Sequence, residues 1–381
     1  TDKQRVDEFN QELQQLGSTL NFNVTATNFI ISVYGFDPNF EKTFQLVTHF
    51  LTYLKPDKSK LNKLTKEKKL EDKAIRKSTD ELSKALTEKV KFDKESEYLT
   101  RLSLNELKQV SAEEFIADLQ KVLSTEANFH YTGTLTRPEI AEIINRNFPI
   151  NSISSESANP NFKDGIAYLK PKVFFYNDSK ATQSIVQAYI LGPVQTNNHE
   201  KNISKLFNSY FGGGMSSLMF QEIREFRSLA YRANSSIENP SVKLNDKAMR
   251  FNLFLSTQAD KTTDAIRAVE SLLEDMPLNE KRLEAAKENL INQAQSAYPN
   301  FREKTQRISL YKQQGYKNDP NKLLVEDVSK MTLQDLEDFY KRNIQGKTVV
   351  YTVVGNKKKI DMRQLEKIGQ VEEMKVREFL K

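Results

Sequence analysis

Two stretches of this chain decide its fold, because they share one pattern. Residues 29–54 read FIISVYGFDPNFEKTFQLVTHFLTYL, and residues 251–276 read FNLFLSTQADKTTDAIRAVESLLEDM. Each begins with alternating apolar residues, typical of a strand, and continues after an Asp-containing break with the apolar spacing of an amphipathic helix. The copies lie 222 residues apart (251 − 29), without a gap. The pattern predicts a repeated strand–turn–helix unit.

A second pair of segments repeats at almost the same distance. Ser111 precedes one amphipathic helix, and Thr332 precedes another 221 residues later (332 − 111). Both are expected N-caps, because a Ser or Thr oxygen accepts a free backbone N–H of the first helical turn. Each helix is followed by an apolar segment that ends in glycine, residues 129–133 and 351–355, which predicts a strand in both copies. Two matches at nearly one offset favour two copies of one fold over chance.

The order of helical and strand patterns indicates the fold class. Residues 61–123 are almost entirely helical in pattern, so helices occur in runs rather than one per strand, and this favours an α+β fold. We predict two homologous domains, residues 1–152 and residues 162–381. Each is expected to be an antiparallel or mixed β-sheet packed against a layer of long helices. The turn-rich residues 151–161 separate them.

The second copy is longer at its front. It has an additional strand at 184–191 and a helix near 200–211, and the counterparts of these elements in the first copy would precede Thr1. We therefore expect a first repeat that is truncated at its N-terminal end, in a segment of a longer chain.

Composition restricts the possible functions. The 381 residues include no cysteine, which excludes disulfides, thiolate metal sites and a cysteine nucleophile. The net charge is only +6, and the densest lysine cluster, residues 55–73, is interleaved with Asp and Glu. That cluster predicts a solvated helix face, and we expect no nucleic-acid partner. No apolar run approaches the roughly 18 residues of a membrane span. We expect a soluble bacterial protein, cytoplasmic or periplasmic.

Histidines are few and scattered. A catalytic zinc site usually takes two or three nitrogen ligands placed close together. The three histidines, His49, His130 and His199, have no helical spacing, and neither H-x-x-E-H nor H-E-x-x-H occurs. No Ser stands in a nucleophile-elbow pattern. We therefore predict no metal ligand and no catalytic residue in this chain.

A run of three glycines, Gly212, Gly213 and Gly214, is the first candidate site. A Walker-type phosphate loop requires Lys and then Ser or Thr after its last glycine, and this sequence lacks them. One interpretation is a turn between two helices that needs a positive φ. The other is a loop that touches a ligand.

Arg224 and Tyr231 are the second candidate pair. They lie seven residues apart (231 − 224), about two helical turns, and would project in similar directions if helical geometry continued between them. Arg offers a planar fork of donors and Tyr a neutral donor. A purely structural role for both remains the alternative.

The surrounding stretch carries a family resemblance. Residues 210–231 read YFGGGMSSLMFQEIREFRSLAY, which resembles the signature of the pitrilysin/insulinase family of zinc metallopeptidases, the inverzincins. Residues 283–287 and 353–356 resemble a later helix and the closing strand of that family. The resemblance covers the second copy almost whole and the first more weakly. Because H-x-x-E-H is missing, the chain resembles the non-catalytic C-terminal half.

The resemblance implies a fold and a function. Members contain repeats of the α+β fold also found in LuxS and the mitochondrial processing peptidase, in two halves that close around a chamber. The zinc would lie in the catalytic half, on the same chain or on a separate subunit, and this segment alone would be inactive. Arg224 and Tyr231 match the family's peptide-contacting Arg and Tyr, and Gly212, Gly213 and Gly214 are further candidates for substrate contact. The peptide is expected to add as a strand to a sheet edge.

Two alternatives remain. The chain could be a catalytically inactive structural or binding subunit of the same fold, similar to the core subunits of a respiratory complex. It could also be an unrelated helix-rich scaffold. The presence of both Arg224 and Tyr231 favours the half-peptidase.

Overall fold

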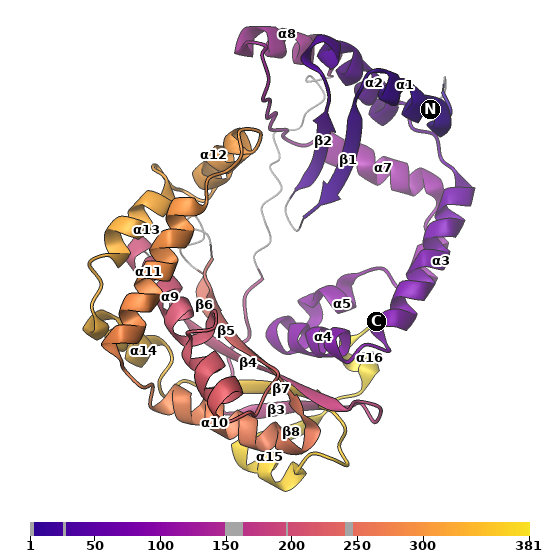
Figure 1. Ribbon diagram of the computed structural model, residues 1–381. Helices are drawn as coiled ribbons and strands as arrows, with labels where there is room; N and C mark the ends of the chain where they lie inside the picture. Colours follow the sequence, from indigo (N-terminus) through magenta and orange to yellow (C-terminus); the bar gives the residue numbers. More distant parts are fainter. Residues whose placement is uncertain (1–3, 26–27, 149–162, 196, 241–246) are drawn as a thin grey trace. The chain divides into compact units, whose positions relative to one another are not determined.

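A computed structural model describes the chain except for residues 1–3, 26–27, 149–162, 196 and 241–246 (Figure 1). The chain forms two compact units rather than one. Unit 1 contains residues 1–70, 102–162 and 299–306, and unit 2 contains residues 71–101, 163–298 and 307–381. The predicted linker at 151–161 lies outside the described residues.

Unit 1 is built around a two-stranded antiparallel sheet. Thr19 of β1 pairs with Tyr34 of β2, and the apolar faces of α1 and α2 form a small core with Phe9, Leu13 and Leu51. The elements of this unit are α1 (Val6–Gln15), β1 (Thr19–Val24), β2 (Phe29–Tyr34), α2 (Phe40–Thr52), α6 (Leu104–Gln109), α7 (Ala112–Leu123) and α8 (Arg137–Asn147). Two helices cross the unit boundary, α3 (Lys58–Ile75) and α12 (Lys304–Gln313).

The strand predicted at residues 129–133 is wrong. These residues have no regular secondary structure, and the side chain of Tyr131 instead forms a hydrogen bond with Asp37. Its hydroxyl donates to the Asp37 carboxylate at 2.5 Å, and the backbone N–H and hydroxyl of Thr134 donate to the same group, each at 2.7 Å. These hydrogen bonds lower the pKa of Asp37. An apolar segment forms a strand only beside a pairing partner, and the described sheet of unit 1 ends at β1 and β2.

Unit 2 contains a six-stranded mixed sheet in the order β5-β6-β4-β7-β3-β8. The first three pairings are antiparallel, and β7–β3 and β3–β8 are parallel. The strands are β3 (Lys172–Asn177), β4 (Gln183–Val194), β5 (Arg232–Glu238), β6 (Ala248–Gln258), β7 (Val350–Gly355) and β8 (Gln370–Glu373). This sheet and its helices confirm the predicted α+β class.

Helices cover both faces of this sheet (Figure 1). One face carries the large core, in which Phe207, Phe211 and Phe251 are fully buried. The other face packs Phe174 and Val350 against a smaller cluster. The helices of the unit are α4 (Thr79–Phe92), α5 (Glu97–Thr100), α9 (Asn198–Phe207), α10 (Thr262–Glu274), α11 (Glu280–Ser296), α13 (Pro320–Val328), α14 (Leu333–Asn343), α15 (Met362–Ile368) and α16 (Val376–Phe379).

Helix α4 lies in the first half of the sequence but packs on the sheet of unit 2. Its Ser83 accepts a hydrogen bond from Gln187 at 3.0 Å, and its Thr87 hydroxyl lies 2.7 Å from the hydroxyl of Thr352 on β7. The contact is partly polar, and burial lowers the pKa of Lys91 on the same helix. The predicted division into residues 1–152 and 162–381 therefore does not describe residues 71–101, which join the second unit.

Both predicted N-caps are confirmed. The Ser111 hydroxyl accepts the N–H of Glu114 at 3.1 Å, and the Thr332 hydroxyl accepts that of Asp335 at 3.3 Å.

Among the described residues, no helix is long and apolar enough to cross a bilayer.

Candidate functional site

The glycine-rich segment closes one edge of the large sheet. The π-helical turn η4 (Asn208–Gly212) continues α9 and lies against β5, the edge strand. Asn208 Oδ1 accepts the N–H of Ile237 at 2.6 Å, and Asn208 Nδ2 donates to the Ile237 carbonyl at 3.1 Å. The amide side chain thus satisfies backbone groups that another strand would otherwise pair with.

The three predicted glycines differ in their surroundings. Gly212 is buried, and a Cβ there would lie 2.6 Å from the backbone nitrogen of Ser235, so only glycine permits this close approach. Gly214 is exposed and has a φ of +86°, as the turn interpretation required. Only Gly213 and Gly214 reach the surface, so Gly212 has a packing role rather than a ligand contact.

The next segment presents Arg224 at the surface. It is a π-helix, η5 (Met219–Phe226), and Ser217 caps its start by accepting the N–H of Phe220 at 3.4 Å. Met219 and Ile223 are fully buried and hold the segment against the core. The guanidinium of Arg224 lies over the Phe220 ring, 4.7 Å from its centroid, and about half of the side chain is exposed. π-helical segments are rare, and single π-helical turns occur frequently at functional sites.

Tyr231 is positioned by the sheet, because helical geometry does not continue from Arg224 to Tyr231. The helix ends before Ser228, which has a left-handed φ of +50°. Beyond it, the Leu229 carbonyl accepts a hydrogen bond from the Thr257 hydroxyl at 2.5 Å. The Tyr231 N–H donates to the Ser256 carbonyl at 2.8 Å. Pairing with β6 therefore replaces the helical geometry before Tyr231 is reached.

The phenol of Tyr231 borders an open cavity. The side chain is 55% exposed, and its hydroxyl accepts a long hydrogen bond of 3.4 Å from Gln258 Nε2. The cavity has a volume of about 640 Å³ and is lined by Thr182, Gln183, Tyr231, Gln258, Ala259, Asp260 and Lys359. Arg224 does not line it, so the structure places both predicted residues at the surface but does not unite them in this cavity.

No metal site emerges from the histidines. His199 Nδ1 lies 2.8 Å from the Asp327 carboxylate, and the ring of His49 packs against Tyr53 at 4.7 Å. Within the described ranges, no group of three or more His, Cys, Asp or Glu side chains could hold a metal ion.

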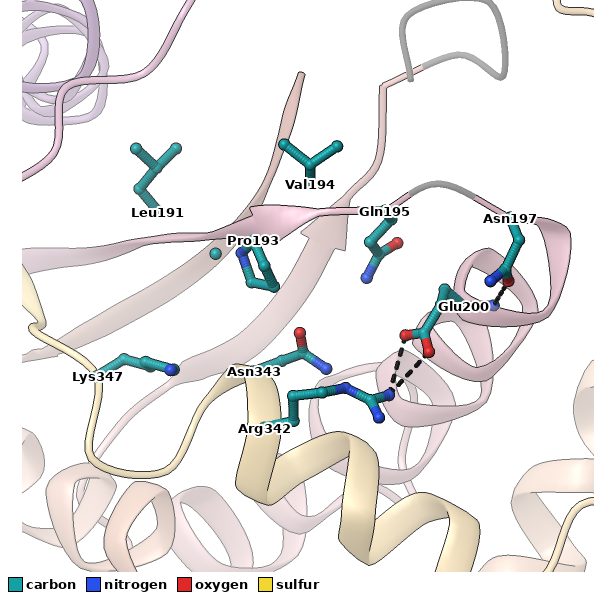
Figure 2. A pocket seen from close by; sticks show the side chains of 10 residues that line it. Leu191, Pro193, Val194, Gln195, Asn197, Glu200, Arg342, Asn343 and Lys347 are labelled. Atoms are coloured by element: carbon teal, nitrogen blue, oxygen red, sulfur yellow. Dashed lines mark hydrogen bonds and ion pairs between the residues drawn. The ribbon is translucent and has the colours of Figure 1, made fainter. Parts of the chain in front are cut away.

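Sequence reasoning missed a second cavity, at the other end of β4. It has a volume of about 520 Å³ and lies between the end of β4, the start of α9 and the end of α14 (Figure 2). The only signal in the sequence was Gly192-Pro193, which interrupts an otherwise strand-like segment. The lining residues are Leu191, Gly192, Pro193, Val194, Gln195, Asn197, Glu200, Arg342, Asn343 and Lys347.

Comparison with protein families identifies the segment that carries these residues. Residues 127–290 match the family described as the peptidase M16 inactive domain. This segment is therefore similar to the M16 inactive domain. It includes Gly212, Arg224 and Tyr231, and the resemblance to the pitrilysin/insulinase family is confirmed.

Solved structures extend the likeness in fold to nearly the whole chain. The peptidase M16 inactive domain from Pseudomonas fluorescens is 14% identical with a TM-score of 0.72, over 93% of this chain and 85% of that one. Pitrilysin is 14% identical with a TM-score of 0.65, over 92% of this chain and 37% of that one. The ferredoxin protease FusC, solved with Arabidopsis ferredoxin, is 12% identical with a TM-score of 0.68, over 92% of this chain and 38% of that one. The chain thus spans little more than a third of these two proteases. The comparison with curated protein sequences gave no match.

Proposed function

We propose that this chain is part of the non-catalytic half of a zinc metalloendopeptidase. In this role it helps to enclose and orient a peptide that a zinc-bearing half, outside this chain, hydrolyses. The observation that carries the proposal is Tyr231, an exposed phenol held by β6 and Gln258 on a segment that resembles the M16 inactive domain and also exposes Arg224.

The chemistry follows from the donors that these side chains offer. The Tyr231 oxygen accepts from Gln258, so its own proton remains available for a peptide carbonyl or for the oxyanion that forms during hydrolysis. Arg224 offers charged N–H groups to carbonyl or carboxylate groups of the peptide. In this proposal, zinc and the water that it would activate belong to the catalytic half.

The peptide would contact this unit through side chains rather than by extending β5. Asn208 occupies the edge groups of Ile237, and Gly212 packs against the backbone of Ser235. A peptide strand would have to displace both. Strand addition, which the family resemblance implied, is therefore not proposed for this edge.

A single substitution tests the role of Tyr231. In the enzyme assembled with its catalytic half, Tyr231→Phe should slow peptide hydrolysis by about 10²–10³-fold, the usual effect of losing one oxyanion donor. Tyr298→Phe is a matched control, because Tyr298 is 84% exposed. The measurement is kcat/KM for a fluorogenic peptide. Equal rates for Tyr231→Phe and the unchanged enzyme would reject the role and favour the alternative, an inactive structural or binding subunit.

The partners are proposed at two levels. FusC was solved with a protein bound, which supports a peptide or protein substrate for this chain. The catalytic half is expected on the same chain or on a separate subunit. By itself, this 381-residue chain should show no peptidase activity and no stoichiometric zinc in metal analysis.

A further inference from the structure

The cavity at the end of β4 is formed by an irregularity in the sheet. The pairing of β4 with β6 shifts register between Leu191 and Val194. A Cβ at Gly192 would lie 2.5 Å from the terminal methyl of Met249, so the backbone approaches that side chain closely. Bulges of this kind redirect side chains and often lie beside binding sites. Here the bulge turns Pro193 toward the cavity, whereas the side chains of Leu191 and Val194 lie on the other side of the strand from Arg342 and Lys347 (Figure 2).

The opposite side carries two cations and one carboxylate. Arg342 Nη2 donates to both oxygens of Glu200, at 2.9 and 3.1 Å, and this contact fixes the guanidinium at the cavity. Lys347 is exposed and forms no ion pair with any residue that the structure describes. Its ammonium group points along the cavity toward Asn343 (Figure 2). Two cations and one anion leave a net charge of +1 at this wall.

The buried amide of Gln195 is only half satisfied, because its Nε2 donates to Met249 Sδ at 2.9 Å while its oxygen lacks a partner among the described atoms. Gln195 is only 2% exposed and lines the cavity. Leaving such an acceptor unsatisfied is costly, on the order of 1–3 kcal/mol. A ligand with an N–H group beside its anionic group would supply the missing donor.

We propose that this cavity binds the C-terminal residue of a peptide. The carboxylate would contact Lys347 and the N–H groups of Arg342 that Glu200 does not use, and the backbone N–H would donate to Gln195. An apolar side chain would pack against Pro193. Glu200 disfavours a dianion such as phosphate, because it cancels one of the two cations, whereas a monoanion with an apolar body suits both walls.

The site has a use in peptide hydrolysis, because each cleavage creates a new C-terminal carboxylate. That use rests on the proposed function, but binding itself does not. The two cavities lie at opposite ends of β4, with Gln183 in one and Leu191 in the other. Tyr231→Phe therefore tests the proposed function alone, and the experiments below test this cavity alone.

A pair of probes isolates the carboxylate. Acetyl-Ala-Leu with a free carboxylate and its C-terminal carboxamide twin would be titrated into the 381-residue chain by calorimetry. We expect the acid to bind at least about tenfold more tightly than the amide. Acetate and inorganic phosphate would be titrated for comparison, and both should bind more weakly than the dipeptide acid. Equal binding of acid and amide, or tighter binding of acetate or phosphate, would overturn the proposal.

Variants with opposite expected effects locate the site. Lys347→Gln should weaken binding of the dipeptide acid about tenfold without changing binding of the amide. Glu200→Gln should strengthen binding of the acid several-fold, because it removes a like charge. Lys330→Gln, an exposed lysine outside the cavity, should change neither. Thermal melts would confirm that each variant folds. Identical affinities in Lys347→Gln and Lys330→Gln would overturn the assignment.

Discussion

Two segments of the molecule have the same local structure in different surroundings. The short 3₁₀ turn and helix at Asp37–Asn39 and Phe40–Thr52 recur, 222 residues later (262 − 40), at Ala259–Lys261 and Thr262–Glu274. The strands before them differ. β2 is only partly buried in a two-stranded sheet, whereas β6 lies between β5 and β4 and is largely buried. Local pattern thus sets local structure, and neighbouring strands decide how much each residue contributes to stability.

The second copy also carries what the first lacks among the described residues. The η4 and η5 segments precede β5, close its edge and present Arg224, and the following turn presents Tyr231. The strand–turn–helix unit is therefore common to both copies, and in the second copy the proposed peptide contacts lie in the segment that precedes it.

The largest expected effect tests the difference between the strands. Phe251→Ala should lower the free energy of unfolding by about 3–5 kcal/mol, because Phe251 is fully buried against Phe207 and Phe211. Its counterpart, Phe29→Ala, should cost only about 1–2 kcal/mol, since that ring is partly exposed. Urea unfolding, with hydrogen exchange to separate the two units, measures both. Equal losses would show that β2 is as well packed as β6 and break the comparison.

A second pair tests how the additional segment closes the edge of β5. Gly212→Ala should destabilise unit 2 by about 1–3 kcal/mol, because the new methyl group meets the Ser235 backbone. Gly214→Ala should cost about 1 kcal/mol, from the left-handed φ alone, because nothing lies within 4 Å of its Cβ. Thermal denaturation gives the order of the two variants. A larger loss for Gly214→Ala would contradict the packing role of Gly212.

Local elements could be predicted from the sequence, and long-range contacts could not. The strand and helix at 251–276 follow from apolar spacing, and both caps follow from residue type. The failures at 129–133 and 71–101 share one cause, because strand formation needs a partner and the docking of α4 joins residues more than 250 positions apart, as Thr87 and Thr352 are. The spacing of apolar residues within a segment indicates neither its strand partner nor the distant sheet on which its helix packs.

The site was predictable to a similar depth. Arg224 and Tyr231 were named from residue chemistry and family resemblance, and both are exposed. The sequence left open whether helical geometry continues between them. It does not, since Ser228 between them has a positive φ, and a non-glycine residue gives no sign of that conformation in the sequence. The cavity beside Arg342 was missed because its walls come from three elements and its shape from a bulge.

The smallest expected effect tests what the two copies share. Ser111→Ala and Thr332→Ala should each lower the free energy of unfolding of their own unit by about 1 kcal/mol, because each removes a cap that accepts one N–H in a capping box. Hydrogen exchange at the first turn of α7 and of α14 measures the loss locally. Replacement by Asp in place of Ala should restore the cap and the protection in both copies. If only one copy responds, the two helices share a capping sequence, but their caps contribute differently to stability. The contribution of a cap depends on how firmly tertiary packing already holds the helix.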